Sequence, residues 1–170
     1  MPSFELLTSD DLDEIGHSAF DADDRLAVAA RLVDAVEQGR VADDADTGYA
    51  LILAAEITEH AGDLHAAHAL AERAVEAYRV RGDGEYVFPR AFRAGLLLRL
   101  GREQEALNEL SGLRPLLTRE PDAVPYVVDA LEDGGQPEIA EQWLGAAPAR
   151  VPGKRLRRSR GPDRAAAGVV

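Results

Sequence analysis

The sequence predicts an all-α fold, an αα-hairpin solenoid of about four stacked helix pairs. Apolar residues recur at helical spacing in successive segments, and no segment shows the period-two alternation of a half-buried strand. Aromatic residues make up only 5% of the 170 residues, whereas alanine, leucine, glutamate and arginine, all good helix formers, are abundant. A similar turn and helix opening occurs three times, at 61–74, 100–110 and 134–147.

The first four helices are expected between residue 9 and residue 80. Ser9 is the capping candidate of the first helix, and the acidic turn 21–24 favours the start of the second. That second helix is amphipathic and ends at Gly39. The third helix should span 45–60, and the fourth should follow the Gly62-Asp63 break and span 64–80.

The last four helices are expected between residue 89 and residue 147. Pro89 suits the first turn of a helix that runs to about Leu100, and Gly101 separates it from a helix over 103–117. A loop over 119–125 leads into a seventh helix that ends near residue 132. Pro137 opens the eighth helix, in which the pattern predicts that Trp143 packs inward rather than anchoring a partner.

The helix openings repeat with a nearly constant period. A small residue lies about five positions after each turn glycine, and these residues are Ala67, Ala106 and Ala140, at steps of 39 and 34 residues. Repeats of this length are typical of helical solenoids, because one helix pair cannot bury its own apolar face and stacked pairs can.

These residues resemble the tetratricopeptide repeat family over roughly residues 9–147. The resemblance is carried by Gly62-Asp63 with Ala67 and Ala74, by Gly101 with Ala106, and by Gly135 with Ala140. It implies a concave groove, lined mainly by the first helix of each pair, that binds a protein or peptide without catalysis and without a cofactor or metal. The groove should include Tyr49, Ile52, Glu56, Glu59, His60, Phe88, Arg99 and Asp129.

Charge is distributed unevenly along the chain, whose net charge is −12. Residues 1–149, the expected repeat domain, hold 30 acids and 12 bases, whereas the tail 150–170 holds one acid and seven bases. An acidic body repels nucleic acid, so the partner segment should be basic or amphipathic. Glu56 and Glu59 are expected to be exposed and to speed association. Composition predicts a solvated tail. The tail could instead dock onto the acidic body of the same or another copy of the chain, which would allow self-association, or it could bind nucleic acid or a membrane.

Two other interpretations remain. His60, His65 and His68 lie close in sequence and could form a zinc or nickel site of a metal-dependent enzyme, but their spacing matches no strong metal motif. The chain could also be a regulatory domain detached from a larger signalling protein. The absence of cysteine, of a long apolar run and of a signal-peptide pattern favours a cytoplasmic protein without a membrane span.

Overall fold

The described part of the chain is built of α-helices that follow one another through short turns. The computed structural model describes residues 6–19, 23–43, 45–81, 87–117, 119 and 121–145. Within these ranges the only β pairing is an isolated parallel bridge between Leu7 and Val41. The helices are α1 (Ser9–Ser18), α2 (Arg25–Glu37), α3 (Thr47–His60), α4 (Leu64–Arg81), α5 (Val87–Arg99), α6 (Glu103–Leu117), α7 (Val124–Asp133) and α8 (Pro137–Gly145), with a 3-10 turn, η3 (Pro121–Ala123), before α7.

The expected all-α class is confirmed, and most helix boundaries agree with the sequence pattern to within two residues. The prediction that Ser9 caps α1 was wrong, because Thr8 is the N-cap. Asp11 accepts hydrogen bonds from the backbone N–H and the hydroxyl of Thr8, and these bonds lower the pKa of its carboxyl group. The expected loop 119–125 is also shorter, because η3 and the first turn of α7 already occupy residues 121–125.

Three helices end in the same kind of turn, at the glycines that the sequence predicts. Gly62, Gly101 and Gly135 have φ of 93°, 76° and 77°, a region that side chains other than glycine rarely adopt. At the first turn, Gly62 N–H donates to the Glu59 carbonyl and Asp63 N–H donates to the Thr58 carbonyl. The same pair of bonds recurs at the other two turns, so the three helices end in the same hydrogen-bonding pattern.

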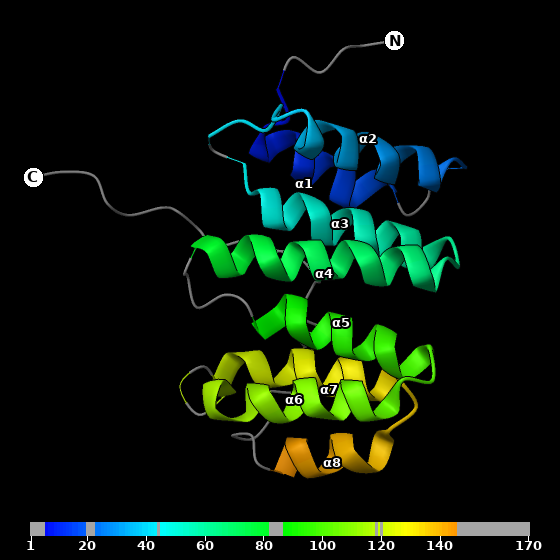
Figure 1. Ribbon diagram of the computed structural model, residues 1–170, viewed down its shortest axis with the longest axis vertical. Helices are drawn as coiled ribbons and strands as arrows, with labels where there is room; N and C mark the ends of the chain where they lie inside the picture. The colour runs from blue at the N-terminus through cyan, green and yellow to red at the C-terminus, as the bar shows by residue number, and fades with distance from the viewer. Residues whose placement is uncertain are drawn as a thin grey trace, which may run out of the picture.

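The helices are stacked in layers along the longest axis of the molecule (Figure 1). α1 and α2 lie at one end and α8 lies at the other, so sequence order is largely spatial order. The closest packing joins α2 to α3, α3 to α4, α4 to α5, α5 to α6 and α7, and α7 to α8. Helices α3 and α5 therefore lie in the middle of the stack and are covered on several sides.

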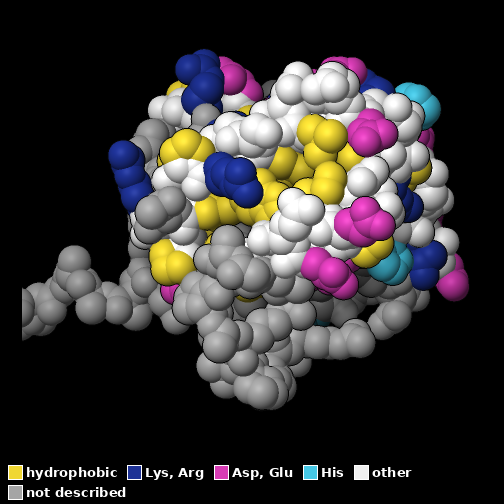
Figure 2. All heavy atoms as spheres, turned by 90° about the horizontal axis from the view of Figure 1, so that it is seen from below, with side chains coloured by type: hydrophobic (Ala, Val, Ile, Leu, Met, Phe, Trp, Pro, Cys, Tyr) yellow, Lys and Arg dark blue, Asp and Glu magenta, His cyan; other side chains and the backbone are white. Residues whose placement is uncertain are grey.

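The apolar interior is divided into three clusters along the stack, shared by α1–α3, by α3–α5 and by α5–α8. The repeated small residues lie inside them: Ala67 and Ala106 are 0% exposed and Ala140 is 1% exposed. Trp143 is also buried, as the sequence pattern predicts. Figure 2 looks at the α8 end and shows apolar side chains near its centre with charged side chains around them.

Candidate functional site

An open pocket lies where α3, α5 and α7 meet. These three are the first helices of the three pairs that the glycine turns join, α3–α4, α5–α6 and α7–α8. The pocket therefore lies on the side of the stack where the repeat pattern places a groove. Its lining residues are Glu59, Phe88, Phe92, Gly95, Leu96, Arg99, Tyr126, Asp129, Ala130 and Asp133.

The floor of the pocket is aromatic. The Phe88 ring stacks on the Phe92 ring with centroids 6.3 Å apart, and the Tyr126 ring meets Phe88 edge-on at 5.0 Å. Gly95 brings α7 close to α5, since a Cβ atom at this position would lie 3.2 Å from the Ala130 carbonyl oxygen. The close approach of the two helices places Tyr126 against the aromatic pair of α5.

The rim of the pocket is mainly acidic. Three carboxylates, those of Glu59, Asp129 and Asp133, line it together with one guanidinium, that of Arg99, which gives a local formal charge of −2. Glu59 forms an ion pair with Arg99 and so connects α3 to α5 across the pocket. The Glu59 side chain is 9% exposed and the Arg99 side chain is 36% exposed, so this pair forms a wall of the pocket. Asp129 and Asp133 are one helical turn apart on α7 and face the same side.

Four of the eight residues expected in the groove line this pocket: Glu59, Phe88, Arg99 and Asp129. His60 is exposed at the end of α3 but is not among the lining residues. Tyr49 is half-buried and packs with the α1–α3 cluster near Gly16. The structure thus brings together the half of the set that lies nearest the α3–α5–α7 contact.

The expected exposure of Ile52 and Glu56 was wrong, and Glu59, also expected to be exposed, has a side chain that is only 9% exposed. Ile52 is 1% exposed and Glu56 is 4% exposed, because α3 packs against α2 and α4 and shares an apolar cluster with α5. Amphipathic periodicity assumes one solvent-facing side, and a central helix of a stack does not have one. Because Glu56 is buried, it cannot speed association as an exposed charge, contrary to expectation.

Six of the ten lining residues lie outside the expected set, and three of these, Phe92, Tyr126 and Asp133, carry an aromatic ring or a charge. Phe92 and Asp133 each follow an expected groove residue, Phe88 or Asp129, by four positions, which places them on the same helical face. Extending the groove by i, i+4 spacing would have found both. Tyr126 precedes the expected residue Asp129 by three positions, which places it on the same helical face as well.

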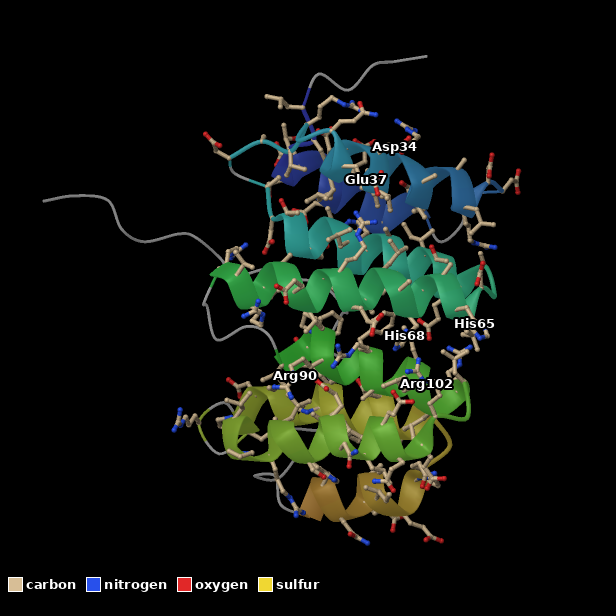
Figure 3. All side chains as sticks on the ribbon, viewed as in Figure 1. Asp34, Glu37, His65, His68, Arg90 and Arg102 are labelled. Carbon is tan, nitrogen blue, oxygen red and sulfur yellow. The ribbon has the colours of Figure 1, made fainter. Side chains whose placement is uncertain are left out.

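The histidine segment does not form a metal site. Among the residues that the structure describes, no group of three or more histidine, cysteine, aspartate or glutamate side chains could hold a metal ion. His65 lies at the start of α4 and is exposed, whereas His68 is directed toward the neighbouring helices, with Arg102 opposite (Figure 3). The side chains therefore diverge, although their positions are close in sequence.

His68 is a buried titratable group between α4 and the next pair. It is 7% exposed, and its Nδ1 lies 3.9 Å from the Glu72 carboxylate. Burial lowers the pKa of His68, Glu72 opposes this effect, Arg102 and Arg93 add to it, and Glu105 opposes it. The folded state therefore favours the neutral imidazole.

The free energy of unfolding should fall as the pH decreases through the ordinary histidine pKa of about 6.5, because the unfolded chain binds a proton there that folded His68 does not. His68→Gln should remove part of this loss. His65→Gln, an exposed change in the same helix, should leave it unchanged. Urea unfolding at pH of about 7.5 and about 5.5 measures the difference, and an equal loss in the parent and His68→Gln would contradict the assignment.

Comparison of the chain with protein-family models, with curated proteins and with solved structures found no match. None of the helices in the described ranges is both long enough and apolar enough to cross a membrane. The argument for function therefore depends on the geometry of the pocket and the arrangement of the helices.

Proposed function

We propose that the chain is a noncatalytic scaffold or adaptor, similar to tetratricopeptide repeat proteins, that binds a protein or peptide. The proposal is carried by one observation: the first helices of three successive pairs converge on a pocket with an aromatic floor and an acidic rim. The layered order of the pairs and the identical glycine turns support the solenoid architecture. On this proposal, α3, α5 and α7 form the concave wall.

The chemistry of the pocket suits a basic or amphipathic segment. Aromatic faces attract cationic side chains, and carboxylates at the rim can accept their hydrogen bonds. Phe88 and Tyr126 are half-buried, so a partner side chain could bury the remaining area of both rings. The same acidic surface disfavours nucleic acid as a ligand of the helical body.

The test begins with a pull-down that uses the full chain as bait and then measures affinity for the recovered partner. Asp129→Asn combined with Asp133→Asn should weaken that affinity about tenfold, since two partly exposed ion pairs contribute on the order of 1–2 kcal/mol together. Binding should also weaken at about 1 M salt, where the screening length is about 3 Å. Phe88→Ala should mainly speed dissociation, because it removes buried contact area.

Glu138→Gln combined with Glu141→Gln is the matched control. Both residues are exposed on α8, neither lines the pocket, and the pair removes the same charge. The control should bind like the parent. If the recovered partner binds the two double variants equally well, this pocket is not the binding site.

A further inference from the structure

The chain carries a segment whose chemistry complements its own pocket. Residues 154–160 read KRLRRSR and contain five bases and one leucine. The segment lies outside the described residues. It belongs to the tail 150–170, which has a net charge of +6, and the preceding 149 residues have a net charge of −18.

Arginine side chains fit the combination of groups in the pocket. A guanidinium can stack on an aromatic face and can also donate two parallel hydrogen bonds to a carboxylate. Stacking of a guanidinium on an aromatic ring already occurs in the described helices. Arg114 lies 5.2 Å from the Trp143 ring centroid, and Arg81 lies 5.7 Å from the Tyr78 ring centroid. Phe88, Tyr126 and Asp129 offer both kinds of group within one pocket.

The segment is close enough to reach the pocket of its own chain. α8 runs back along α7 after the turn at Gly135, so the α8 end at Gly145 lies on the side of the α7 start, which carries Tyr126 (Figure 1). Lys154 follows Gly145 by nine positions, and nine extended residues span about 30 Å. Neighbouring helices are about 8–10 Å apart, so this spacer exceeds the distance between adjacent layers severalfold.

We propose that residues 154–160 occupy the α3–α5–α7 pocket of the same molecule and so compete with the partner. The inference rests on the proposed function, because it assigns an internal occupant to the same site. A short tether gives the segment an effective concentration in the millimolar range at the pocket. A partner then binds only the fraction of molecules in which the pocket is open, which lowers its apparent affinity.

A nitroxide label tests the occupancy in the full chain. The chain has no cysteine, so Ser159→Cys provides a single attachment point within the basic segment. The label should remove most of the amide signal intensity of Phe88, Tyr126 and Asp129 in nuclear magnetic resonance spectra, and it should spare the amides of α1. High salt should restore the signals, because the contact depends on exposed charges.

Two variants of the labelled chain connect the effect to the pocket. Asp129→Asn combined with Asp133→Asn should restore the amide signals, and Glu138→Gln combined with Glu141→Gln should not. The spectra themselves report whether each variant is folded. Equal signal loss in both double variants would overturn the assignment to this pocket, as would the absence of any signal loss in α5 and α7.

A mixed sample distinguishes a tail that binds its own molecule from a tail that binds another molecule. The sample contains isotope-labelled chain without nitroxide and unlabelled chain with nitroxide. Signal loss in this mixture would show that the tail comes from another molecule and would overturn the intramolecular proposal. The outcome is also distinct from a failure of the proposed function. If a partner binds at the pocket but the labelled tail leaves the signals of α5 and α7 unchanged, the proposal that the tail occupies the pocket is wrong and the proposed binding function stands.

Discussion

Ala67→Leu should destabilise the protein by about 1–3 kcal/mol, because the added atoms have no free volume to occupy. Ala67 is 0% exposed and lies in the cluster that α4 shares with α3 and α5. In a chain of this size each kcal/mol lowers the melting temperature by about 2–4 °C. Ala106→Leu in the next pair should have an effect of the same size, since Ala106 is also 0% exposed.

Ala69→Leu is the matched control for this prediction. It makes the same substitution two residues further along α4, at an exposed position. Leucine is almost as good a helix former as alanine, so the melting temperature should change little. Thermal unfolding followed by circular dichroism gives all three values. If Ala67→Leu and Ala106→Leu both melt like Ala69→Leu, the assigned role of the repeated alanines as close-packing positions is wrong.

Glu109→Gln should cost about 1–3 kcal/mol, because Glu109 is shared by two arginines between α5 and α6. Its Oε1 accepts from Arg90 Nε at 2.5 Å and its Oε2 accepts from Arg93 Nη2 at 2.5 Å. The three side chains are only 15–20% exposed, so water compensates poorly for a lost partner. A glutamine amide offers one acceptor oxygen and turns a donor toward the second arginine.

Glu105→Gln is the control on the same helix. Glu105 pairs with Arg102, the residue that precedes α6, and the two side chains are well exposed at 57% and 44%. Exposed pairs of this kind contribute little, because water and salt screen them. Chemical denaturation should therefore give a clearly lower midpoint for Glu109→Gln than for Glu105→Gln. Equal midpoints would mean that Glu109 does not hold α5 and α6 together.

Much of the local structure follows from short-range rules that the sequence displays directly. Apolar periodicity places the helices, and the glycines at 62, 101 and 135 mark the turns, because the positive φ of these turns favours glycine. The spacing of Ala67, Ala106 and Ala140 predicts burial, and all three are buried. Each of these features depends on residues within one or two helices, so a single sequence is sufficient to find them.

The candidate site depends on contacts between helices that are distant in sequence. Four expected groove residues line the pocket, but Glu56 lies in the interior because α3 packs against α2 and α4 and shares an apolar cluster with α5. Phe92, Tyr126 and Asp133 join the site because Gly95 lets α7 approach α5. Helical periodicity shows which residues share a face, whereas the tertiary structure decides which face another helix covers.

The sequence by itself determined the all-α class, the order of the helices, their glycine turns and the small residues at the packing positions, because each is specified by local backbone preference and side-chain size. Only the tertiary structure decided which acidic residues border the pocket and which lie in the interior. The physical reason is that exposure depends on the neighbours of a helix, and in this stack those neighbours include helices tens of residues away along the chain.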